Sequence, residues 1–153
     1  GIRDLIVTGV QTCAPSDLDY KKRLVRYVSF EEIIIVPPKK WKNLEKELLK
    51  VEEGKVILSK IELSDFVILL DELGTEFNSV DFSSFLQKKM NSGIKTVLFI
   101  VGGPFGFSKE VYQRANEKIA LSKMTFTHDM VRLFFVEQMY RAFTILKNEP
   151  YHH

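Results

Sequence analysis

A glycine-rich segment, Gly102-Gly103-Pro104-Phe105-Gly106, directly follows an apolar stretch and is the first candidate for chemistry in this chain. Residues without a β-carbon let the backbone approach a ligand closely, so such a segment can hold a small molecule. It lacks the GxGxxG spacing of dinucleotide folds and the GK[ST] ending of phosphate-binding loops, which argues against both classes. Taken alone, the segment also fits a plain turn between a strand and a helix.

Charged and titratable residues interrupt a largely apolar stretch near the C-terminus. A buried unpaired charge costs several kcal/mol, so each of these residues needs a partner or a wet, functional cavity. Glu137 and Arg141 are four residues apart, which fits either an ion pair along a helix or a functional pair. Arg132 has no acid three or four residues away except Asp129, and His128 lies one turn before it. We therefore expect Arg132 and His128 to contact a substrate.

The elements that must position these residues follow from an alternation of β-branched apolar stretches with amphipathic ones. The expected strands are Ile2–Val10, Ile33–Val36, Phe66–Leu70, Thr96–Val101 and the short stretch Ile119–Leu121. The expected helices run from Ser16 or Asp17 to about Val28, from Trp41 to about Ile61, over Asp81–Asn91, from Ser108, and from about Thr127 to Lys147. In the second of these helices, the residues expected on one side are Leu44, Leu48, Val51 and Leu58.

The expected strands are continuous apolar runs, which indicates burial on both faces and thus a parallel sheet. The sequence therefore predicts a single α/β domain over residues 1–153, with a parallel-rich sheet and helices on both faces. In open parallel sheets, ligands bind at the carboxyl ends of the strands. The segments expected at that edge are Leu70-Asp71-Glu72, Gly102–Gly106 and Leu121–Phe126.

The last helix is apolar around almost its whole circumference. Within Met130–Leu146, the polar residues are Arg132, Glu137, Gln138, Arg141 and Thr144. A helix that is apolar on all sides is buried on all sides. In a small domain, the outer face of a last helix can pack only on another chain, so we expect a homodimer whose interface includes this helix.

Four motifs occur in one order at fitting separations along the chain. They are Gly102-Gly103-Pro104-Phe105-Gly106-Phe107-Ser108, Leu121-Ser122-Lys123-Met124-Thr125-Phe126-Thr127-His128, Glu137-Gln138-Met139-Tyr140-Arg141-Ala142 and Pro150-Tyr151-His152. Together they closely resemble the large-subunit ribosomal RNA methyltransferase H family of the SPOUT class. The resemblance covers the whole chain. Two small departures are the start at Gly1-Ile2 and the final His153, where family members usually carry Lys or Arg.

The resemblance implies a fold whose C-terminal part forms a trefoil knot, an exception to the rule against knots. It also implies a homodimer that uses S-adenosylmethionine to methylate N3 of a pseudouridine in 23S rRNA, in the assembled large subunit or 70S ribosome. By motif, the cofactor contacts fall on Leu70, Gly102, Gly103, Leu121, Ser122, Lys123, Met124, Thr125 and Phe126. The positions that resemble the family's substrate side are His128, Arg132, Glu137, Arg141, Tyr151 and His152.

Methylation of the uracil N3 requires that its proton be lost or nearly lost. Arg132 and Arg141 could lower the pKa of this N3–H by placing positive charge beside the ring carbonyls. Glu137 or His128 could take the proton, directly or through water, and the sequence does not decide between them. Tyr151 could stack on an exposed base or serve as a docked C-terminal anchor.

The charge is distributed unevenly, although the net charge is only +2. Residues 20–60 carry eleven lysines and arginines against six acids, which fits either a solvated face or a phosphate-facing one. The candidates for phosphate contacts are Lys21, Lys22, Arg23, Arg26, Lys39, Lys40 and Lys42.

Several classes of protein are disfavoured by what the sequence lacks. A single cysteine, Cys13, argues against internal disulfides and thiolate zinc sites, so we expect no metal. No apolar run approaches the roughly 18 residues of a membrane span, and we expect no signal peptide and a cytoplasmic location. Two other functions stay open: a non-catalytic ribosome-binding dimer and a nucleotide-binding module that uses the glycine segment.

Overall fold

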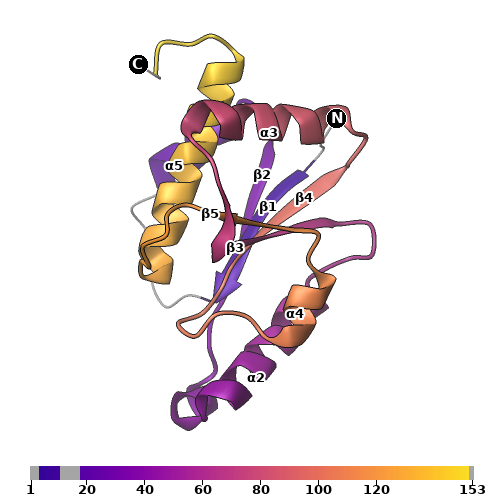
Figure 1. The fold of residues 1–153 in the computed structure, drawn as a ribbon, viewed down its shortest axis with the longest axis vertical. Coiled ribbons are helices and arrows are strands. Elements are labelled where there is room, and N and C mark those ends of the chain that lie inside the picture. Colours follow the sequence, from indigo (N-terminus) through magenta and orange to yellow (C-terminus); the bar gives the residue numbers. More distant parts are fainter. Residues whose placement is uncertain (1–3, 11–17, 152–153) are drawn as a thin grey trace.

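A parallel sheet of five strands forms the centre of the computed structural model, which describes residues 4–10 and 18–151 (Figure 1). The strands are β1 (Asp4–Val10), β2 (Ser29–Ile35), β3 (Phe66–Glu76), β4 (Thr96–Val101) and β5 (Glu117–Ala120). Their order across the sheet is β2-β1-β4-β3-β5, and every neighbouring pair is parallel. The parallel sheet predicted from the sequence is therefore confirmed.

Helices cover both faces of the sheet (Figure 1). One layer contains α1 (Leu18–Leu24), α3 (Ser79–Asn91) and α5 (His128–Leu146), and the other contains α2 (Lys46–Ser59) and α4 (Lys109–Arg114). Strand β4 shows why both layers are needed. Its Phe99 side chain packs in the cluster beneath α3 and α5, whereas the neighbouring Leu98 and Ile100 pack in the cluster beneath α2 and α4. All three are almost fully buried, as continuous apolar strands predict.

Side-chain caps explain where three of the helices begin. Asn78 precedes α3 and accepts a hydrogen bond from the backbone N–H of Asp81 at 2.8 Å. Ser108 and Thr127 cap α4 and α5 in the same way. These side chains satisfy backbone donors that the first turn of a helix leaves unpaired. The expected helix stop at Gly93 is also confirmed, because this residue follows α3 with a φ of +81°.

Two strands exceed their predicted length by three residues or more. Strand β2 begins at Ser29 rather than Ile33, because the charge of Glu32, which breaks the apolar run, is held by side chains of α1 and α5. Strand β3 continues to Glu76 rather than ending at Leu70. Its pairing with β5 is interrupted between Leu70 and Thr75 and then resumes. The polar residues inside this interruption conceal the second half of the strand in the sequence.

The side predicted for the second helix is only partly buried, although its Leu58 packs against the core. Leu48 and Val51 are 47% and 38% exposed, and the buried residues of α2 are Glu53, Gly54 and Ile57. The reason is close packing at Gly54, where a β-carbon would lie 2.4 Å from Oγ of Ser108. Helix α2 also begins later than predicted, because Trp41 belongs to a separate short 3-10 helix, η1 (Lys39–Asn43). Helix α1 ends at Leu24, before the expected Val28.

Some sequence-based expectations fall outside the described residues. They concern the strand start at Ile2, the thiol of Cys13, the capping residues Ser16 and Asp17, and the C-terminal residues His152 and His153. Within residues 4–10 and 18–151, no helix has both the length and the apolar character needed to cross a membrane.

Candidate functional site

A cavity of about 820 Å³ lies beside the segments at the carboxyl ends of three parallel strands, β3, β4 and β5. Its walls come from Leu70–Leu73, where the pairing of β3 with β5 is interrupted, from Val101–Phe107 after β4, and from the segment that joins β5 to α5. This is the edge of a parallel sheet at which ligands usually bind, and the volume falls within the range of small-molecule sites.

Most of the predicted cofactor residues line this one cavity. The lining includes Leu70, Gly102, Gly103, Leu121, Ser122, Met124, Thr125 and Phe126. Lys123 is the exception, because it is exposed and its side chain is not part of the wall. The structure thus brings together three segments that are far apart in the sequence, and their role as cofactor contacts remains a prediction.

Backbone approaches its surroundings closely along the glycine segment. A β-carbon at Gly103 would lie 2.5 Å from Oε2 of Glu53, a residue of α2. A side chain on Gly103 would therefore collide with this carboxyl group. Glu53 is only 4% exposed, and burial raises its pKa from 4.5 to about 7. The glycine segment is consequently a thin wall with the cavity on one side and a buried carboxyl group behind it.

A hydrogen bond between two elements fixes another part of the cavity lining. The hydroxyl of Tyr112, from α4, donates to Oδ2 of Asp71, and Oδ1 of Asp71 accepts from the backbone N–H of Leu73 at 2.8 Å. Burial and the bond to the Asp71 carboxylate raise the pKa of Tyr112, so the phenol stays protonated and keeps donating. Sequence reasoning placed Asp71 at a strand end but missed Tyr112, because no pattern in the sequence joins α4 to β3.

The structure describes all four predicted catalytic residues, which are His128, Arg132, Glu137 and Arg141. Of these four, His128 is the one that lines the cavity. It occupies the first position of α5, and its Nε2 lies 3.7 Å from Oδ1 of Asp129. The imidazole is partly buried. His128 is therefore placed where a group on a bound molecule could reach it.

Arg132 is buried away from the cavity wall, with 4% of its surface exposed. Its Nη1 lies 3.1 Å from Oε1 of Glu32, and Nζ of Lys21 lies 2.6 Å from the same oxygen. The acidic partner that its own helix does not supply comes from β2. A buried pair of this kind is costly to break from one side. Arg132 is thus held by the fold, and its contact with a substrate remains a prediction.

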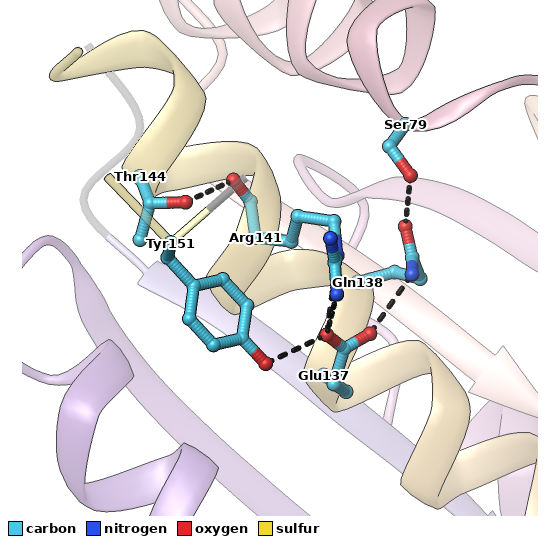
Figure 2. A network of polar contacts seen from close by, with 6 residues as sticks. All are labelled: Ser79, Glu137, Gln138, Arg141, Thr144 and Tyr151. Atoms are coloured by element: carbon cyan, nitrogen blue, oxygen red, sulfur yellow. Dashed lines mark hydrogen bonds and ion pairs between the residues drawn. The ribbon is translucent and has the colours of Figure 1, made fainter. Parts of the chain in front are cut away.

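Glu137 is the centre of a network of polar contacts on α5 (Figure 2). Its Oε1 accepts from Nη2 of Arg141 at 2.9 Å and from the hydroxyl of Tyr151 at 2.9 Å. Its Oε2 accepts from Nε2 of Gln138, whose amide oxygen accepts from Ser79 of α3. The helical ion pair considered for Glu137 and Arg141 is therefore present.

Tyr151 is docked on this network from the C-terminal end of the described chain. The guanidinium carbon of Arg141 lies 4.9 Å from the centre of its ring, and the ring of Tyr140 meets it edge to face. Burial and the bond to Glu137 raise the pKa of Tyr151. These contacts fit the anchoring role considered for Tyr151, while its role toward RNA remains untested.

The network and the cavity are separated along α5. The last cavity-lining residue of the helix is Val131, six residues before Glu137. At 1.5 Å per residue, these positions are about 9 Å apart along the axis. Within one protomer, the structure does not bring Glu137, Arg141 and Tyr151 to the cavity wall.

The basic residues proposed for phosphate contacts are mostly exposed. Lys22, Arg23 and Arg26 lie on the surface around α1, as do Lys39, Lys40 and Lys42 in and around η1. Lys21 differs, because it is half-buried and paired with Glu32. The exposed residues are available to a polyanion, and their contact with RNA remains a prediction.

Comparison with known proteins shows the family of the chain. A family model described as "Predicted SPOUT methyltransferase" matches residues 12–152. The chain belongs to the SPOUT methyltransferase family. This confirms the family predicted from the sequence, and SPOUT membership implies the knotted C-terminal fold.

Relatives of this SPOUT protein carry the name "Ribosomal RNA large subunit methyltransferase H". The relative from Christiangramia forsetii is 60% identical over 134 residues, which cover 88% of this chain and 85% of the relative. The one from Flavobacterium psychrophilum is 61% identical, with 88% and 86% covered. The one from Porphyromonas gingivalis is 47% identical over 146 residues, with 95% and 93% covered.

A SPOUT methyltransferase needs a methyl-donor cofactor, and the cavity at the strand ends has a volume suited to a small molecule. Sequence reasoning missed several residues around it, namely Lys46, Glu53 and Tyr112, because they come from α2 and α4, which no motif links to the strand ends. Among the described residues, no group of three or more His, Cys, Asp or Glu side chains is placed to hold a metal ion.

Proposed function

We propose that this SPOUT methyltransferase acts on ribosomal RNA, with S-adenosylmethionine as its methyl donor and N3 of a pseudouridine in 23S rRNA as its acceptor. The substrate is the assembled large subunit or the 70S ribosome, which would place the protein in the cytoplasm. The name shared by relatives 47–61% identical supports the ribosomal RNA substrate. The observation that carries the proposal is that the predicted cofactor segments line one cavity at the strand ends.

The residues of the cavity suit this donor. Gly102 and Gly103 contribute to the cavity wall, and Leu70 and Leu121 provide apolar surface. Asp71 offers carboxylate oxygens that can accept hydrogen bonds from sugar hydroxyls. When bound, S-adenosylmethionine supplies a methyl group activated by a positively charged sulfur. The protein's part is to hold the donor and acceptor in line, which can account for much of a rate enhancement.

Removal of the N3 proton is assigned to the polar residues of α5. His128 lines the cavity and could take the proton directly or through water. Arg141 carries the positive charge that could stabilise the developing anion, and Glu137 and Tyr151 hold it in position. Because Arg132 is buried against Glu32, we assign it the role of fixing α5 rather than direct contact with the base.

The separation between the cavity and the Glu137 network supports a homodimer. An apolar patch formed by Met124, Phe126, Met130 and Phe134 lies beside the cavity, and each of these residues is at least 39% exposed. The rings of Phe126 and Phe134 meet edge to face at 5.5 Å. A second chain that covers this patch could bring its own Glu137 network toward the cavity. Met130 and Phe134 of this patch belong to α5, the helix that the sequence predicts to be part of a dimer interface.

Methyl transfer is tested with ribosomes from a strain that lacks this modification. Tritium from labelled S-adenosylmethionine should enter intact 70S ribosomes and not naked 23S rRNA, and mass spectrometry of nucleosides should find N3-methylpseudouridine. Binding of ribosomes without methyl transfer would favour the non-catalytic dimer instead. Methylation of a different base would refute the assigned acceptor.

The dimer is tested by analytical ultracentrifugation at micromolar concentration. Phe134→Asp should shift the protein from dimer to monomer, because it buries a charge in the patch. Leu63→Asp is the matched control, since Leu63 is fully exposed in the loop before β3. A wild-type protein that sediments as a monomer would exclude the dimer.

A further inference from the structure

A rigid turn at the edge of the cavity carries an aromatic ring to which no function has been given. The backbone N–H of Gly106 donates to the carbonyl of Gly103 at 3.2 Å, which closes a four-residue turn. Pro104 and Phe105 occupy its two central positions, and Gly106 ends it with a φ of +84°. Proline has a fixed φ, so this turn has little conformational freedom. Phe105 is therefore held at a defined place on the rim of the cavity.

A lysine from another element lies over this ring. Nζ of Lys46, in the first turn of α2, is 5.6 Å from the centre of the Phe105 ring. Both side chains line the cavity, and Phe105 is 46% exposed. A single exposed aromatic residue is common and proves nothing alone. Here, however, a fixed ring and an ammonium group from separate elements meet at the opening of one cavity.

The charges around the cavity make Lys46 distinctive. Among the described residues that line it, Lys46 is the one lysine or arginine, whereas Asp71 and Glu72 supply negative charge. An anion that reaches the cavity from solvent therefore has one permanent cation to pair with. That cation lies beside an aromatic surface, and the combination of a stacking ring with a phosphate-pairing cation is how proteins hold unpaired nucleotides.

The position of Phe105 and Lys46 indicates that they contact the methyl acceptor rather than the methyl donor. Leu70 and Val101, at the strand ends, are 8% and 2% exposed, so a donor held there lies deep. A nucleotide that belongs to a large particle must approach from solvent and meets the rim first. Phe105 and Lys46 are on that rim and are exposed.

We propose that Phe105 and Lys46 form a binding site for an RNA nucleotide at the mouth of the cavity. The Phe105 ring stacks on a base, and the Lys46 ammonium pairs with a phosphate oxygen of the same strand. This inference rests on the proposed function, because it assumes that RNA delivers the acceptor. It adds two residues to the substrate side that neither the motifs nor the comparisons assign.

The test of Phe105 compares ribosome methylation with donor binding in the full-length protein. Phe105→Ala should lower kcat/KM for ribosomes about tenfold, the order expected for loss of one base–aromatic stack. The Kd for S-adenosylmethionine, measured by calorimetry, should stay within about twofold of wild type. Phe105→Trp should restore kcat/KM, and Phe105→Leu should not, because leucine is apolar but cannot stack. A merely structural role for Phe105 would not separate these two variants.

The test of Lys46 uses the salt dependence of ribosome binding. Lys46→Gln should weaken binding and reduce the slope of log K against log salt by about one, as expected for one lost phosphate contact. Lys46→Arg should keep the slope. Lys60→Gln is the control, since Lys60 is exposed at the opposite end of α2. Thermal unfolding should be unchanged in all of these variants.

Three outcomes would overturn the inference. Weaker donor binding in Phe105→Ala, with wild-type kcat on ribosomes at saturating donor, would place the pair on the donor instead. Wild-type kcat/KM in both Phe105→Ala and Lys46→Gln would show that the pair binds no nucleotide. A wild-type protein that fails to methylate ribosomes would overturn the proposed function together with this inference.

Discussion

The buried carboxyl group of Glu53 should make the stability of the protein depend on pH. Burial raises its pKa from 4.5 to about 7, so the folded protein holds this proton more tightly than the unfolded chain does. Below pH 4.5 both states are protonated and the group has no effect. As the pH rises from 4.5 to 7, the unfolded chain loses the proton first, and the free energy of unfolding falls.

The size of this effect follows from the two pKa values. At about 1.4 kcal/mol for each tenfold change in proton affinity, the full cost is on the order of 3 kcal/mol above pH 7. Glu53→Gln keeps the shape of the side chain but removes the titration. We therefore expect Glu53→Gln to gain stability relative to wild type between pH 5 and pH 8, by an amount approaching this cost.

The assay is urea unfolding followed by circular dichroism at pH 5, 6, 7 and 8, at one protein concentration because a dimer would link stability to concentration. Glu47→Gln serves as the control on the same helix, since the Glu47 side chain is 70% exposed. Its difference from wild type should stay flat within a few tenths of a kcal/mol. If the wild-type and Glu53→Gln stabilities run parallel from pH 5 to pH 8, Glu53 does not carry a buried charge and the reasoning is wrong.

Three further predictions concern packing and the α5 network. Gly54→Ala should lower the free energy of unfolding by about 1–3 kcal/mol, because the added methyl group collides with Ser108, which caps α4. In a helix without such a neighbour, the same change would stabilise the protein. A Tm higher than that of wild type would contradict this prediction. Arg132→Met should cost about 3 kcal/mol in urea unfolding because it deprives the buried Glu32 of a partner, and Glu32→Gln in the same chain should recover part of the loss. Full stability of Arg132→Met would rule out this pair as a structural element. Tyr151→Phe removes the bond to Glu137 and should lower ribosome methylation without changing donor affinity, and equal rates would limit Tyr151 to anchoring.

Local patterns predict the parts of this fold that depend on neighbouring residues. Thr96–Val101 is a strand with the predicted bounds, because a short uninterrupted apolar run is typical of a buried strand. The last helix is also found close to its predicted bounds, since Thr127 is a good cap and the apolar run after it is long.

The residues that sequence reasoning misplaced all depend on distant partners. Glu32 stands just before the predicted strand Ile33–Val36, yet it lies inside β2 because Arg132 and Lys21 reach it from two helices. Glycine is unfavourable inside a helix, yet Gly54 is where α2 approaches α4. Such contacts are properties of the folded packing and leave no periodic signal in the sequence.

The candidate site likewise has parts that the sequence predicts and parts that it does not. The three segments at the strand ends could be predicted because parallel strands direct their connections to one edge. The contribution of Lys46 and Tyr112 could not, since helices α2 and α4 reach the cavity only through the packing of the second layer. The separation of the Glu137 network from the cavity was equally hidden, because sequence motifs carry no distances.

The interrupted pairing between β3 and β5 has a consequence for how the protein is made. Leu70–Leu73 are shaped by a strand that begins only at Glu117, so one wall of the cavity depends on a contact between distant parts of the chain. Contacts of long sequence separation form late in folding, and synthesis delivers the N-terminal part first. A growing chain can therefore build much of its sheet before the proposed donor site is complete. Donor binding at that site would then stabilise only a chain whose β5 has paired with β3.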